Sequence, residues 1–140
     1  MELALRRILL ALVFLGTGGL AVELLLLEHI ESTTQWIPLV CLGAGFATAL
    51  IVALRPGRTP LRAFRFVMAT FVAAGLLGVY YHYAGNVEFA LERKPELRGF
   101  PLIWEALTGA TPALAPGALA QLGLLGLAFA YRHPQSEKES

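Results

Sequence analysis

The chain has 140 residues, of which 56% are hydrophobic and 15% are charged, and its formal net charge is +1. A soluble domain of this size usually carries about 25% charged residues, and a nucleic-acid-binding protein usually carries a basic excess. The composition therefore excludes an ordinary soluble domain, argues against nucleic acid as a partner, and favours a protein surrounded by lipid.

The first apolar stretch covers residues 8–27 and follows Arg6 and Arg7. A helix of about 20 residues, rising about 1.5 Å per residue, matches a hydrocarbon core about 30 Å thick. The stretch is longer than the apolar core of a signal peptide, and no small-residue cleavage site follows it. We therefore predict a first transmembrane helix that is retained.

Glu23 lies inside this stretch, about one helical turn from its outer end. An ionisable side chain at such a depth is costly and usually faces a bundle interior or a cavity. Three interpretations stay open: the carboxylate reaches the lipid head groups, it makes a buried hydrogen bond to another helix, or it serves a proton, an ion or a metal.

The second apolar stretch covers residues 36–54, and the third covers residues 64–83. The Arg-Pro-Gly-Arg-Thr-Pro sequence between them predicts a tight turn. Cys41, the single cysteine, is expected to be a small packing residue of the second helix. Beyond the third stretch, residues 86–93 favour a helical extension.

The connector of residues 85–112 is long, and connectors of this length usually carry structure or function. Pro95, Gly99 and Pro101 interrupt it, and residues 102–107 predict a short interfacial helix anchored by Trp104. The fourth apolar stretch covers residues 113–131. It contains Gln121, for which we expect a hydrogen bond across helices.

These elements predict an all-α membrane protein with four transmembrane helices in an antiparallel up-down bundle. The bundle occupies residues 1–133 as a single domain, with the short interfacial helix in the third connector, and residues 134–140 form a polar tail. Every predicted span contains glycines, which indicate close helix packing, either within the bundle or with a partner subunit.

The basic residues are distributed unequally between the two sides of these helices. Eight of the 11 lie before the first span, between the second and third spans, or after the fourth, whereas three lie in the long connector. Positively charged residues stay on the cytoplasmic side. We therefore predict a multi-pass protein of the inner (plasma) membrane with both termini in the cytoplasm.

This topology gathers carboxylates, histidines and an amide on the outer side, as candidates for binding a ligand or ion: Glu23, Glu28, His29, Glu31, His82, Asn86, Glu88 and Glu92. Imidazole and carboxylate groups bind zinc, manganese and iron, with His29, His82 and Glu28 as the candidate metal ligands. A haem held by the two histidines is a further candidate. The spacing matches no metal-binding motif, and interfacial or hydrogen-bonding roles are the alternatives.

The sequence contains no combination of nucleophile and base, and no phosphate-binding loop. We therefore expect a non-enzymatic accessory or scaffold subunit of a membrane assembly. Its partners would be the lipid bilayer and either further copies of this chain or other membrane subunits. The alternative is an outward-facing protein that binds a metal, an ion or haem in transport or electron transfer.

Overall fold

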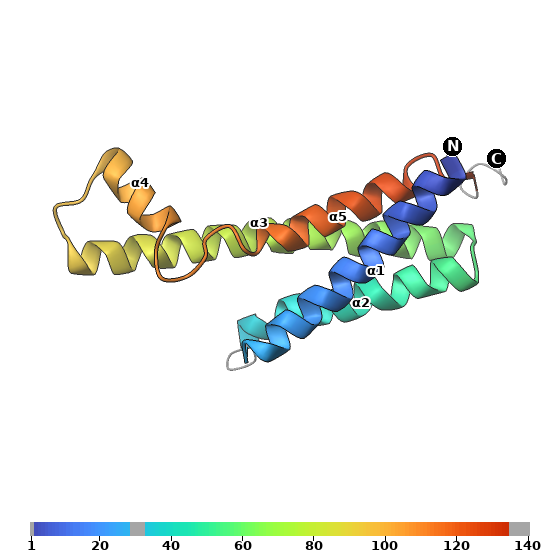
Figure 1. Ribbon diagram of the computed structural model, residues 1–140, viewed down its shortest axis with the longest axis horizontal. Coiled ribbons are helices and arrows are strands. Elements are labelled where there is room, and N and C mark those ends of the chain that lie inside the picture. Colours follow the sequence, from blue (N-terminus) through green and yellow to red (C-terminus); the bar gives the residue numbers. More distant parts are fainter. Residues whose placement is uncertain (1, 29–32, 135–140) are drawn as a thin grey trace.

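The computed structural model describes residues 2–28 and 33–134, and these residues form helices and turns without a strand (Figure 1). The elements follow in the order α1 (Glu2–Leu26), the short 3-10 helix η1 (Thr33–Gln35), α2 (Trp36–Leu54), α3 (Arg58–Arg93), α4 (Gly99–Leu107) and α5 (Gly117–Ala130).

Three of the helices, α1, α2 and α3, are long and apolar enough to cross a membrane. Only 11% of the most apolar window of α1 is buried within the protein, and only 22% of the corresponding windows of α2 and α3. Side chains such as Leu15, Val40 and Phe66 are therefore exposed although they are strongly apolar. Water does not favour such a surface, so these helices indicate a membrane protein.

Prolines lie in the first turn of three of the helices. Pro38, Pro60 and Pro101 are each the third residue of their helix, α2, α3 and α4 respectively. The N–H groups of a first turn have no partner inside the helix, so a proline at this position loses no hydrogen bond. Pro101 is therefore compatible with a start of α4 at Gly99, three residues earlier than the sequence predicts.

Four helices pack around a shared core. Helix α1 contacts α2 and α5, and α3 contacts the same two helices. The longest interface joins α3 and α5, which lie side by side in Figure 1. The largest fully buried side chains come from α1, α2 and α3: Val13, Thr17, Leu42, Leu61, Phe64, Met68 and Phe71.

Glycines allow the backbones of α3 and α5 to approach closely. A Cβ atom on Gly75 would lie 2.5 Å from the Ala120 backbone nitrogen, and one on Gly123 would lie 2.6 Å from the Met68 carbonyl oxygen. Gly16 similarly makes room for a leucine of α5. By contrast, a Cβ on Gly19 or Gly43 would meet nothing within 4 Å. Some glycines are therefore needed for close packing between helices of this chain, whereas others face a surface that no described residue covers.

The third and fourth apolar elements differ in length from the predicted spans. Helix α3 has 36 residues and includes the extension expected over residues 86–93, whereas α5 has 14 residues and begins at Gly117 instead of residue 113. Pro112 and Pro116 explain the late start, because a proline lacks the N–H and disfavours helical geometry in the residue before it. Residues 113–116 instead form turns, and hydrogen bonds between residues three apart, such as Ala115 to Pro112, continue into the first turn of α5.

Candidate functional site

The glutamates that the sequence predicts on the outer side, within and after α1, do not come together with other described residues in a site. Glu23 and Glu28 are both exposed, and neither side chain makes a hydrogen bond or ion pair with another described residue. Glu28 adopts a left-handed conformation (φ 51°) two residues after the end of α1. His29 and Glu31, the other candidates in this region, lie outside the described residues.

No group of three or more histidine, cysteine, aspartate or glutamate side chains within residues 2–28 and 33–134 is close enough to hold a metal ion. Glu88 and Glu92 lie exposed on α3. The described part of the chain therefore shows no arrangement of ligands that supports the metal and haem hypotheses. Both hypotheses also involve His29, which lies outside the described residues, and they stay predictions.

His82 and Asn86 both reach the segment that connects α4 to α5. Asn86 is only 4% exposed, although it lies on a helix that is mostly apolar. His82 Nδ1 lies 3.3 Å from the Pro112 carbonyl oxygen, to which it donates when that nitrogen carries the proton. The two residues are one helical turn apart, so one face of α3 holds two successive points of the connector.

The side-chain amide of Asn86 uses its full hydrogen-bonding capacity inside the protein. Its Nδ2 donates to the carbonyl oxygens of Ala106 (2.8 Å) and Thr111 (2.6 Å). Its Oδ1 accepts from the Thr111 backbone N–H (3.2 Å) and hydroxyl (2.7 Å). Two donors and two acceptor sites are all that an asparagine amide offers. Asn86 therefore fastens the end of α4 and the following connector onto α3.

Gly109 packs directly on this amide, because a Cβ at that position would lie 2.8 Å from Asn86 Cγ. Two shallow depressions flank the contact, with volumes of about 370 and 310 Å³. Tyr81 and Phe89 line the first, and Arg93 and Glu105 line the second. Both open widely to the surroundings, unlike the concave sites that bury most of a small ligand.

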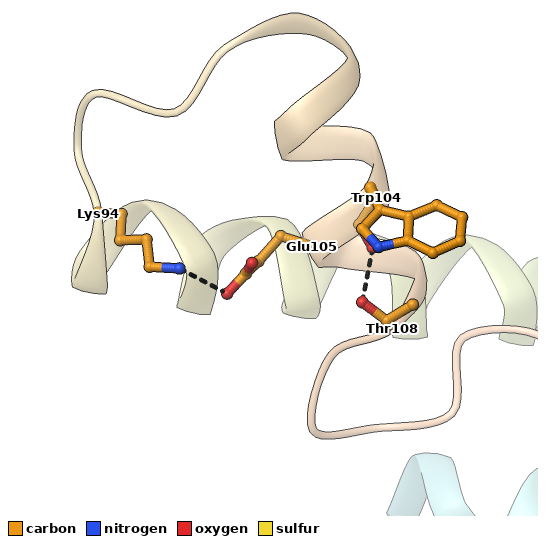
Figure 2. A network of polar contacts seen from close by, with 4 residues as sticks. All are labelled: Lys94, Trp104, Glu105 and Thr108. Atoms are coloured by element: carbon orange, nitrogen blue, oxygen red, sulfur yellow. Dashed lines mark hydrogen bonds and ion pairs between the residues drawn. The ribbon is translucent and has the colours of Figure 1, made fainter.

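Helix α4 is held to the outer end of α3 by a second contact. Lys94 Nζ lies 3.3 Å from Glu105 Oε1, with both side chains partly exposed, so this ion pair adds at most about 1 kcal/mol. Figure 2 shows Lys94 pointing toward Glu105 while the Trp104 indole points away from the pair. The Thr108 hydroxyl donates to the Trp104 carbonyl oxygen at 2.8 Å and helps to end α4.

One face of α4 is apolar and uncovered. Phe100 is 73% exposed and Trp104 59%, and their rings stack with centroids 6.4 Å apart. Ala106, on the opposite face, is fully buried against α3. After its side of the membrane in the predicted topology, we call α4 together with residues 86–93 of α3 the outer platform. In Figure 1 it lies beyond the ends of α1 and α2, at the far end of α3.

At the opposite end of the molecule, two arginines bind the end of α5. Arg6 of α1 donates to the carbonyl oxygens of Phe129, Tyr131 (3.0 Å) and Arg132 (3.0 Å). Arg65 of α3 donates to the carbonyl oxygen of Ala130. The last carbonyls of a helix have no partner within the helix and carry negative partial charge, so the guanidinium groups suit them in both geometry and sign.

His133 lies beside these arginines and packs on the Phe129 ring at 5.3 Å between ring centroids. Burial lowers the pKa of His133, and the positive charges of Arg6 and Arg65 lower it further. The sequence assigns the arginines a role in orientation. It gives no sign that they also bind the end of α5, because the contact joins residues more than 60 positions apart.

Gln121 lies on the exposed face of α5 and makes no hydrogen bond to another residue within the described ranges. The expected bond across helices is therefore not seen there. The buried amide that does link elements is Asn86. The sequence places it among candidate ligands because it lies four residues after His82, and no local pattern pairs it with Thr111.

No protein-family model, curated protein or solved structure matches this chain. The function is therefore argued from the geometry of its two ends.

Proposed function

We propose that this chain is a four-pass protein of the inner (plasma) membrane, with an antiparallel up-down bundle and both termini in the cytoplasm. In this proposal it is a non-enzymatic accessory subunit that presents the outer platform to another membrane subunit. The observation that carries the proposal is the outer platform itself, a fastened structure whose apolar face is left uncovered.

The length of α3 supports a position of the platform outside the hydrocarbon. Its 36 residues correspond to about 54 Å of helix, whereas the hydrocarbon core is about 30 Å thick. If Arg65, bound to the end of α5, marks the inner boundary, about 20 residues of α3 cross the core and the outer boundary falls near Gly85. Residues 86–93 and α4 then lie in the head groups and the water beyond them.

The turns before α5 support a fourth pass. The 14 residues of α5 cover about 21 Å. Residues 112–116 precede it in turns of the 3-10 type, and at about 2 Å per residue they add about 10 Å. Together they match the hydrocarbon thickness. Non-helical backbone at such depth requires its polar groups to be satisfied, and the Pro112 carbonyl oxygen lies within hydrogen-bonding distance of the Ala115 N–H and of His82 Nδ1.

The exposed face of α4 supports a protein partner rather than lipid tails as its cover. Phe100, Ile103 and Trp104 are all at least 45% exposed on this face, beyond the estimated hydrocarbon boundary. A contiguous apolar patch in such surroundings typically marks a protein contact, and aromatic residues dominate the energetics of contacts of this kind. We propose that this face of α4 contacts an apolar outer surface of a different membrane subunit.

The experiment compares two variants of the full chain, expressed at native level and extracted in mild detergent. In the first, Phe100→Ser and Trp104→Ser remove the aromatic face. In the second, Glu88→Ser and Glu92→Ser change exposed residues of α3 on the same platform. We expect the first variant to lose a co-purifying membrane subunit that the wild type and the second variant both retain.

Three outcomes would contradict this proposal. One is a partner retained equally by both variants, and another is a wild-type chain that purifies as a monomer from every detergent tested. The third is a self-association lost only in the Phe100/Trp104 variant, which would identify a second copy instead of a different subunit. Unchanged thermal unfolding of both variants serves as the control for folding, since the substituted side chains are exposed.

A further inference from the structure

The inner end of the bundle holds cationic groups from three elements around one helix terminus. Arg6 and Arg65 are half-buried where α1, α3 and α5 meet, and both donate to the last carbonyls of α5. Arg132 follows α5 in a left-handed conformation (φ 43°), with its guanidinium 5.6 Å from the centre of the Tyr131 ring.

Among the side chains that the structure describes, the negative charge that faces these groups is too small to balance them. A helix C-terminus carries roughly half a negative charge, whereas Arg6 and Arg65 alone carry two positive charges. The one ion pair among the described residues, Lys94 with Glu105, lies at the other end of the molecule. Helices α2 and α5 contain no carboxylate, and α3 has none before Glu88.

The guanidinium groups also keep donors for a ligand. A guanidinium has five N–H donors in a planar fork. Arg6 uses three of them on Phe129, Tyr131 and Arg132, and Arg65 uses one on Ala130. The remaining donors are held near the end of the apolar helices by hydrogen bonds that fix both side chains. Planar donors preorganised in this way suit phosphate oxygens, which arginine binds through two parallel hydrogen bonds.

We propose that Arg6 and Arg65, with Arg132 beside them, bind the phosphate of an anionic phospholipid head group at the junction of α1, α3 and α5. The apolar helices place the site where head-group phosphates lie in a bilayer, and the lipid tails would extend along the exposed sides of α1 and α3. This inference concerns the end opposite the outer platform and does not depend on a partner subunit.

The test uses full-length protein, delipidated in detergent and titrated with phosphatidylglycerol, with phosphatidylcholine or with inorganic phosphate, while lipid binding is counted by native mass spectrometry. We expect phosphatidylglycerol to bind more tightly than phosphatidylcholine. Arg65→Gln should weaken phosphatidylglycerol binding about tenfold, since it removes charge-assisted hydrogen bonds. The matched control is Arg62→Gln, which removes an equal charge from an exposed neighbour on the same helix and should leave binding within about twofold.

A second readout separates binding from an effect on folding. NMR titration of His133 should show its pKa rising when phosphatidylglycerol is added to the wild type, because a nearby phosphate offsets Arg6 and Arg65. If Arg65→Gln does not fold, Arg65→Lys takes its place. It keeps the charge but loses the fork, and it should bind phosphatidylglycerol more weakly than the wild type does.

Equal binding of the two lipids, or equal losses in Arg62→Gln and Arg65→Gln, would overturn the proposal in favour of a diffuse basic surface. An effect seen only after Glu2, Glu137 and Glu139 are all changed to Gln would also overturn it, because the chain's own carboxylates would then fill the site. If inorganic phosphate binds as tightly as phosphatidylglycerol, the result would support the site and identify free phosphate as its ligand.

Discussion

Asn86 is the residue on which the outer connector depends. A single amide supplies four hydrogen bonds to residues 20 and 25 positions later in the chain. Buried amides with every donor and acceptor satisfied specify one arrangement, whereas the loss of one partner leaves polar groups without a bond. Asn86 therefore sets the position of α4 and of the connector that leads into α5.

Asn86→Ala should destabilise the protein by about 2–3 kcal/mol, because Thr111 and Ala106 lose their partner. Thermal unfolding in detergent measures the loss, and hydrogen exchange should accelerate in residues 106–112. Glu88→Ala is the matched control, since Glu88 is exposed on the same helix and its replacement should change stability by less than about 0.5 kcal/mol. Equal exchange rates in the two variants would show that the amide does not hold the connector.

His133 should make stability depend on pH. Its pKa is lowered in the folded protein by burial, Arg6 and Arg65, whereas the unfolded chain titrates near the ordinary value of about 6.5. The unfolded state therefore binds the proton more readily. The contribution of neutral His133 is complete above about pH 6.5 and is lost as the pH falls toward the folded pKa.

We expect the midpoint of thermal unfolding to fall between pH 7 and pH 5 by more in the wild type than in His133→Gln. Parallel profiles for the wild type and His133→Gln would mean that this histidine has the same pKa in the folded and unfolded states.

At the residue scale, the sequence predicts the common face of His82 and Asn86 but not what that face contacts. A spacing of four residues within an apolar helix is a local signal, and periodicity reveals it. The partners of Asn86 lie across the break at Pro95 and Gly99, and no local pattern shows that the chain returns there. The same limit hides the contacts of Arg6 and Arg65 with α5.

At the element scale, hydropathy and length predict α1 and α2 well. The bounds of α2 agree with the predicted stretch, and α1 begins earlier because helical geometry continues through Arg6 and Arg7 to Glu2. Hydropathy fails for α5, since Ala113, Leu114 and Ala115 are as apolar as the helix but lie between two prolines. The apolar stretch reports depth in lipid, whereas the prolines decide the conformation.

The contact between α3 and α5 gives a prediction for two glycines that hydropathy treats alike. Gly75→Ala should destabilise the protein by about 1–3 kcal/mol, because its Cβ would overlap the Ala120 backbone and force the helices apart. Gly43→Ala should be neutral or stabilising by up to about 1 kcal/mol, since its Cβ meets open space and alanine favours the helix. Thermal unfolding of both variants in one detergent checks the difference, and similar effects would refute the close approach.

At the scale of the whole molecule, the proposed topology puts the outer platform and the inner arginines on opposite sides of the membrane. In a Cys41→Ala background, we expect a membrane-impermeant maleimide to label Glu96→Cys in spheroplasts, whose inner membrane is closed. Arg58→Cys should be labelled only after the membrane is opened. In closed cells, labelling of Arg58→Cys without Glu96→Cys would indicate the reverse orientation, whereas labelling of both positions would contradict the pass assigned to α3.

The unbroken course of α3 has a mechanical consequence. A single helix joins the arginines of one end to α4 at the other, without a hinge between them. If α3 behaves as a rod about 54 Å long, a change in tilt of about 10° carries its far end sideways by about 9 Å. Helices tilt when the surrounding bilayer thins or thickens. The protein would in this way convert membrane thickness into a lateral displacement of the outer platform.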